Sequence, residues 1–116
     1  MQELITKELM GLLEANRYMS QRSSKAANHI KPVVKIFNPC GAATWLISEI
    51  HEDGDTLFGL CDLGMGFPEL GYVSLSELQS IRKRLGLPLE RDTGWVAEMS
   101  LVEYAEKSRR EEQINA

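Results

Sequence analysis

The architecture is clearest in one segment, Phe58-Gly-Leu-Cys-Asp-Leu-Gly-Met-Gly-Phe-Pro-Glu-Leu-Gly-Tyr-Val-Ser-Leu-Ser-Glu-Leu78. Its pattern predicts a strand end, a glycine-rich loop, a short strand and then a helix. Ser74 and Glu77 have the spacing of a capping box, which marks the start of that helix. Gly86 is expected to end it. The inner stripe of this helix is expected to be Leu75, Leu78, Ile81 and Leu85.

Three strands are expected to precede the loop, over residues 32–37, 43–50 and 56–62. The run Trp45-Leu46-Ile47 is apolar on both faces, which is typical of a central strand. Asp53-Gly54 lies between two strand patterns and is a strong hairpin signal. Because the connections are short, we expect one mostly antiparallel sheet of three to five strands.

A helix is predicted near each end of the chain. Leucines at helical spacing indicate one over residues 3–16, with Thr6 as its candidate cap. Ser100 and Glu103 form a second capping-box pattern, which predicts a helix through about Arg110. With a further helix packed on one face of the sheet, these features indicate the α+β class.

The domain organisation follows from length and composition. A chain of 116 residues with ordinary apolar content is expected to form a single domain over residues 1–116. The polar, serine-rich residues 18–30 are expected to be a flexible linker, and residues 108–116 a frayed tail. No apolar run reaches the length of a membrane span, and no secretory leader is evident, so we expect a cytoplasmic protein without membrane contact. Cys40 and Cys61 are expected to be reduced thiols, with a disulfide as the alternative.

Charge is distributed unevenly along the chain, whose formal net charge is −4. Residues 36–73 contain no Lys or Arg, whereas the flanking segments contain both signs. Direct nucleic-acid binding is not expected of this middle region, because it offers no base to a phosphate. The acids of the region are Glu49, Glu52, Asp53, Asp55, Asp62 and Glu69.

The glycine-rich loop is the candidate functional site. Met65, Phe67 and Leu70 are apolar side chains in a loop, where they either fold onto the core or form an exposed contact for a partner. Asp62 and Glu69 flank them, so an exposed loop would suit a protein partner with a basic surface. We predict partner binding through these five residues, and no catalytic residue, metal site or cofactor is assigned.

Other interpretations of the same segments stay open. Asp62 and Glu69 could converge with a histidine in a small metal-dependent hydrolase. Arg82, Lys83 and Arg84 could serve a nucleic-acid accessory protein, although bases also favour the end of a helix. The acids around His51 resemble a cation loop only weakly, because the spacing of a calcium loop is absent.

The segment 58–78, with the blocks 32–37, 41–46 and 85–92, resembles a family of small bacterial proteins classed only as a domain of unknown function. The resemblance extends over roughly residues 3–105. It implies a protein encoded on plasmids, integrative elements or phage-like islands, often near conjugation or anti-restriction genes, and no activity comes with it. By this resemblance we expect a non-enzymatic accessory protein, such as an anti-CRISPR or anti-restriction inhibitor that acts by direct protein contact.

Overall fold

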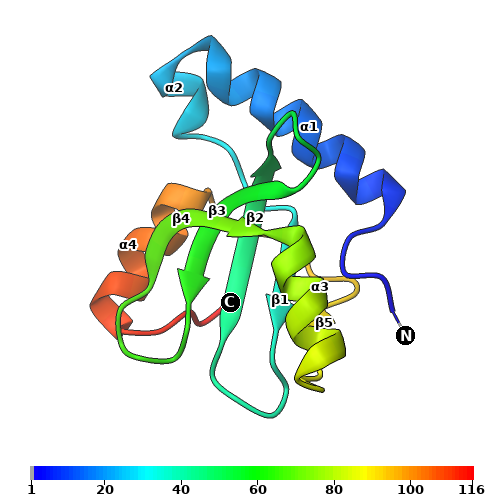
Figure 1. The fold of residues 1–116 in the computed structure, drawn as a ribbon. Coiled ribbons are helices and arrows are strands. Elements are labelled where there is room, and N and C mark those ends of the chain that lie inside the picture. The colour runs from blue at the N-terminus through cyan, green and yellow to red at the C-terminus, as the bar shows by residue number, and fades with distance from the viewer. Residues whose placement is uncertain (1) are drawn as a thin grey trace.

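The computed structural model describes residues 2–116 and contains a five-stranded sheet with helices on both faces (Figure 1). Residue 1 of the expected domain lies outside the described part. No helix in the described part is long and apolar enough to cross a membrane. The helices are α1 (Lys7–Arg22), α2 (Ser24–Ala27), α3 (Leu75–Arg84) and α4 (Leu101–Glu111). The strands are β1 (Val34–Phe37), β2 (Thr44–Ile50), β3 (Thr56–Asp62), β4 (Glu69–Ser74) and β5 (Glu90–Arg91).

The sheet order is β4-β3-β2-β1-β5, and each neighbouring pair is antiparallel. The expected α+β class and antiparallel sheet are therefore confirmed. β1 to β4 are neighbours in chain order because the turns between them are too short for a crossover, whereas β5 follows α3 and pairs with β1 at the far edge. The central strand β2 is almost entirely buried, as its apolar run predicts. β4 and β5 are the two edges, and β4 is the longer of them.

The sheet is covered on both faces, and the strands supply alternate residues to each cover. One core lies beneath α1, α3 and the N-terminal segment, with Ile36, Ile47 and Leu57 at its centre. The second core lies beneath α4, where Leu46 and Leu60 pack against Tyr104. In Figure 1, α3 and α4 lie toward opposite sides of the sheet. The sheet is thus a middle layer between two helical layers.

A close backbone approach explains one glycine of the sheet. Gly59 lies opposite Ile47, where the register of β2 shifts before Glu49. A Cβ atom built on Gly59 would lie 2.1 Å from the carbonyl oxygen of Leu46. Any side chain at this position would therefore displace β2.

The expected linker over 18–30 is wrong for most of its length, because α1 continues to Arg22 and α2 follows at once. Contacts to the sheet hold the extension in place. Arg17 is buried and its Nη1 donates to the carbonyl of Ile50 at 2.8 Å. Ser20 donates to the carboxylate of Glu49, also at 2.8 Å. These long-range contacts outweigh the low helix propensity of a serine-rich segment.

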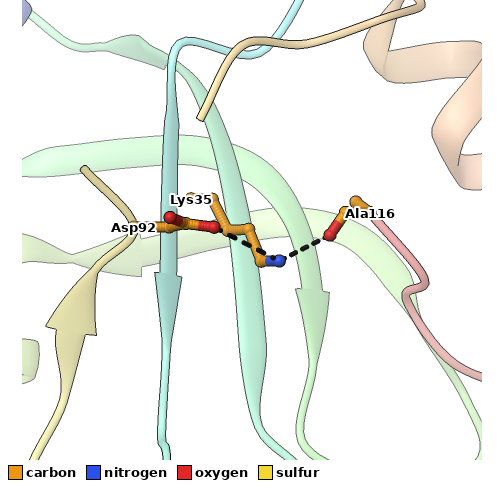
Figure 2. Close-up of polar contacts among 3 residues, drawn as sticks. All are labelled: Lys35, Asp92 and Ala116. Carbon is orange, nitrogen blue, oxygen red and sulfur yellow. Dashed lines mark hydrogen bonds and ion pairs between the residues drawn. The ribbon is translucent and has the colours of Figure 1, made fainter. Parts of the chain in front are cut away.

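The expected frayed tail is also corrected, because the chain after α4 folds back onto the second core. Glu112 takes a left-handed conformation (φ 60°) that ends the helix and reverses the chain. Ile114 then packs, half-buried, against the second core. At the last residue, Lys35 Nζ donates to the main-chain oxygen of Ala116 at 2.5 Å and lies 3.7 Å from Asp92 (Figure 2).

The helix boundaries agree closely with the caps expected from sequence. Thr6 accepts the amide of Leu9, and Ser100 forms a complete capping box with Glu103. The inner stripe of α3 is shorter than expected, because Leu85 is 70% exposed. Leu85 is the C-cap, so it follows the last residue of the helix and does not continue its buried face.

Candidate functional site

Exposed apolar side chains gather where β3 passes into β4. We call them the β3–β4 patch. Phe67 is 78% exposed and Met65 is 70% exposed, which decides that the loop is not folded onto the core. A groove of about 350 Å³ runs beside them and includes Glu69 in its wall. The patch consists of Leu63, Met65, Phe67, Leu70 and Tyr72.

The backbone of the loop explains this exposure. Gly64 and Gly66 have φ values of 83° and 85°, in the left-handed region that favours glycine. The chain therefore reverses sharply between the two strands. Pro68 is buried at the end of the reversal, while the side chains before it remain in solvent. β4 begins at Glu69, so Glu69 and Leu70 belong to a strand and not to the expected loop.

Asp62 has a different role from the one expected. It is 2% exposed, so it does not belong to the exposed contact surface. Its Oδ1 accepts the amide of Gly64 at 2.8 Å, and its Oδ2 accepts the amide of Ile114 at 3.0 Å. One carboxylate therefore ties the loop to the C-terminal tail. Asp62 positions the patch and does not touch what the patch would bind.

The charge around the patch is more mixed than the sequence indicates. Glu69 is the only charged residue in the wall of the groove. A neighbouring groove of about 630 Å³ brings Arg109 and Glu112 from the C-terminal region beside Phe67. No ion pair within the described residues uses Arg109 or Glu69. Of the two acids expected beside the patch, Glu69 lies at the groove and Asp62 is buried, while Glu112 and Arg109 add one charge of each sign.

The acids of the β2–β3 hairpin are structural. Asp53 accepts the amides of Asp55 and Thr56 at 2.9 and 2.8 Å, and the hydroxyl of Thr56 at 2.6 Å. These bonds, led by the one from the hydroxyl, lower the pKa of Asp53 to about 2. A carboxylate that accepts three hydrogen bonds within its own turn serves to fix that turn.

Asp55 joins this hairpin to the start of α3. Its carboxylate accepts the hydroxyl of Ser74 at 2.6 Å and the amide of Ser76 at 2.8 Å. The hydroxyl bond from Ser74 is the main reason that the pKa of Asp55 is lowered. Ser74 also accepts the amide of Glu77 at 3.2 Å, as a helix cap does. Asp53 and Asp55 therefore stabilise the fold and are not assigned to a binding site.

The structure does not assemble the residues of the hydrolase alternative. His51 follows β2 and lies against the ring of Tyr72, with the ring centroids 5.2 Å apart. Asp62 is at the opposite end of β3, paired with Thr44. His29 lies beyond α2, near Glu103 rather than near Asp62. Within residues 2–116, no three His, Cys, Asp or Glu side chains come together as metal ligands would.

The basic run on α3 is partly used by the fold. Arg82 donates to the main-chain oxygen of Gln2, which fastens the N-terminal segment against the helix. Lys83 and Arg84 remain exposed at the end of the helix. Two adjacent bases at a helix C-terminus are explained by the helix dipole.

Sequence reasoning did not identify several residues that shape the site. Arg109 of α4 lies beside Phe67, and Ile114 of the tail donates to Asp62, which holds the loop. Both contacts depend on the tertiary fold, and a polar C-terminal segment carries no local signal of them. Tyr72 was placed in a strand without a role, yet it is 64% exposed on the edge strand. An exposed aromatic residue on a strand next to apolar loop residues is a signal that could have included it.

Comparison with known proteins gives a family without an activity. A family model described as "Protein of unknown function (DUF2958)" matches residues 4–115. No curated protein and no solved structure matches the chain. The family description assigns no activity, so the functional argument starts from the surface described above.

Proposed function

Since the chain belongs to the DUF2958 family of proteins of unknown function, we propose from its surface that it is a non-enzymatic protein-binding accessory protein. The single observation that supports this is the β3–β4 patch, in which five apolar side chains lie exposed beside one groove. Isolated apolar residues are ordinary on a protein surface, whereas contiguous ones mark a contact site.

Met65 and Phe67 are the anchors in this proposal. Both are held away from the core by a loop that Asp62 and two left-handed glycines fix in place. A fixed loop loses little conformational freedom when it binds, so less of the contact energy is lost to ordering. Burying one such side chain contributes about 1.5–3 kcal/mol. Anchors of this kind lie at the centre of an interface, surrounded by polar residues.

The partner proposed is a protein whose own surface is apolar with a basic edge. Glu69 would face a Lys or Arg of that partner, because it is the one charge in the wall of the groove. Phosphate backbones fit the patch poorly, since Arg109 is the only base that lines either groove beside it. Direct contact with nucleic acid is therefore not part of the proposal.

The biological setting of the proposal comes only from the sequence resemblance, which is carried chiefly by residues 58–78. That resemblance implies a mobile element as the source, and hence a CRISPR-type or restriction-type defence complex in the cytoplasm as the first partner to test. Acting by contact, the protein would cover a surface that such a complex needs.

The test is affinity capture with the wild-type chain and Phe67→Ala, followed by titration against the captured protein. The expected loss is about 2 kcal/mol, or roughly 30-fold in Kd. Val96→Ala is the matched control, because Val96 is an equally exposed apolar side chain (79%) outside the patch. Equal affinity of Phe67→Ala and wild type would overturn the placement of the site.

A further inference from the structure

We propose that β4 pairs with β4 of a second copy, so that two five-stranded sheets join into one continuous sheet. This inference goes beyond the proposed function and stands on separate observations: the backbone of the edge strand and its residue pattern. It gives the chain a second interaction surface, which shares Leu70 and Tyr72 with the β3–β4 patch and does not use Leu63, Met65 or Phe67.

The outer edge of β4 is free for pairing. β4 has β3 as its one neighbour, and it ends the sheet on that side (Figure 1). The amide of Leu75 donates to the carbonyl of Asp55 at 2.9 Å, just beyond the pair of Thr56 with Ser74. Hydrogen-bonded pairs alternate along an antiparallel ladder. Counting back from Leu75 by twos, Val73, Gly71 and Glu69 direct their amides and carbonyls toward β3.

The backbone amides and carbonyls of Leu70 and Tyr72 therefore point outward, away from β3. No backbone hydrogen bond to either residue from any segment other than β3 occurs within the described residues. Natural edge strands are usually protected by shortness, lysine, proline or a bulge. β4 has six residues, one charge at Glu69, and no lysine or proline. The opposite edge is different, because β5 is only two residues long.

The residue pattern of β4 is complementary to itself. In a two-fold pairing centred on Gly71, Leu70 lies opposite Tyr72 of the second copy, and Tyr72 opposite its Leu70. These are the residues whose backbone groups face outward, so four new hydrogen bonds form. The two apolar pairs lie on the same face of the joined sheet, and each covers a side chain that is now exposed.

The same register avoids unfavourable contacts. The two Gly71 residues face each other as a non-hydrogen-bonded pair, the closest spacing in an antiparallel ladder. No side chain is present there to clash. Glu69 lies opposite Val73 of the second copy, so the two glutamates are not neighbours. Since each chain carries a net charge of −4, screening by salt is expected to strengthen the pairing.

The first test is the oligomeric state by light scattering and sedimentation over a concentration series. The expected result is a concentration-dependent species of twice the 13.1 kDa chain mass. Tyr72→Pro removes an outward amide and no bond to β3, so it is expected to weaken self-association at least tenfold. Val96→Ser, at an exposed apolar site outside β4, is expected to leave it unchanged.

A cross-link provides the second test and covers the case in which Tyr72→Pro fails to fold. Cα atoms of a non-hydrogen-bonded pair lie about 4.5 Å apart, within the range that a disulfide spans. A Cβ at Gly71 meets nothing within 4 Å, so Gly71→Cys is tolerated. With Cys40 and Cys61 replaced by Ala, this variant is expected to oxidise to a disulfide-linked dimer, whereas Ser74→Cys in the same background is not.

Either of two results would overturn the pairing. One is a wild-type chain that stays monomeric at every concentration together with no cross-link at position 71. The other is a dimer that folded Tyr72→Pro leaves intact. Partner capture is read separately through Phe67→Ala, so a failed dimer and a failed partner site give different results.

Discussion

Single residues in this protein have roles that their type alone does not reveal. Asp62 was expected at a surface, and it is instead a buried acceptor for two backbone amides. Gly59 lies in a regular strand, where its lack of a side chain is required by the closeness of Leu46. In both cases the determining contact comes from a distant part of the sequence.

Gly59→Ala is expected to lower the free energy of unfolding by about 3 kcal/mol or more, because the new Cβ would overlap a backbone oxygen that cannot rotate away. Chemical denaturation measures this. Gly11→Ala is the control, since a Cβ there meets nothing and the position lies within α1, where alanine is favoured by about 1 kcal/mol. Similar stability of Gly59→Ala and wild type would contradict the packing described.

The two free thiols are expected to react at very different rates. Burial raises the pKa of Cys61 to about 11, so almost none of it is thiolate at neutral pH. Cys40 is exposed in the turn after β1. Alkylation with iodoacetamide, followed by mass spectrometry, should modify Cys40 in the native protein and Cys61 only after unfolding. Equal labelling of both residues in the folded chain would be inconsistent with this structure.

At the scale of elements, the connections are as informative as the strands. The hairpin carboxylates of Asp53 and Asp55 hold the β2–β3 turn and link it to α3. Asp62 links the β3–β4 loop to the tail after α4. The loop that presents Met65 and Phe67 is therefore fastened by a side chain that never reaches its surface.

Asp62→Ala is expected to destabilise the fold by roughly 2–4 kcal/mol, because two partly buried backbone amides lose their acceptor. Thermal and denaturant unfolding report the loss. Asp92→Ala is a control, since Asp92 makes only a long, half-exposed ion pair with Lys35 (Figure 2). If both substitutions lowered the free energy of unfolding by the same small amount, the hydrogen bonds of Asp62 would not stabilise the loop and the tail as described.

The hairpin gives a prediction about acid stability. The pKa of Asp53 falls from 3.8 to about 2 on folding, so its ionised form favours the folded state. That contribution is complete above the unfolded value and is lost as the pH falls through the folded value. The stability advantage of wild type over Asp53→Asn should therefore shrink between about pH 5 and pH 2. A constant difference across this window, measured by denaturant unfolding, would argue against the hydrogen bonds assigned to Asp53.

The elements also show how far sequence reasoning extends. Caps at Thr6, Ser74 and Ser100 and the Asp53-Gly54 hairpin were predictable, because each depends on neighbours within a few residues. The continuation of α1 past residue 18 was not, since it depends on Arg17 reaching the end of β2. Within the candidate site, the exposure of Phe67 was left open by the sequence, and Asp62, which was expected on the contact surface, is buried.

At the scale of the whole molecule, two helical layers cover the sheet and leave one long edge open. The β3–β4 patch and the free edge of β4 lie on that side and share Leu70 and Tyr72. The other edge is shorter, because β5 has two residues, and the groove beside it brings Arg82 and Glu90 together with Leu87 and Pro88. The protein contact proposed above lies on the side of the longer edge.

The most direct measurement of that claim places a photo-reactive benzoyl-phenylalanine at position 67 and irradiates the protein in lysate of a host cell. We expect one dominant cross-linked protein other than the chain itself, and far less cross-linking when the same group is placed at position 96, which is equally exposed. Equal, diffuse cross-linking from both positions would contradict it.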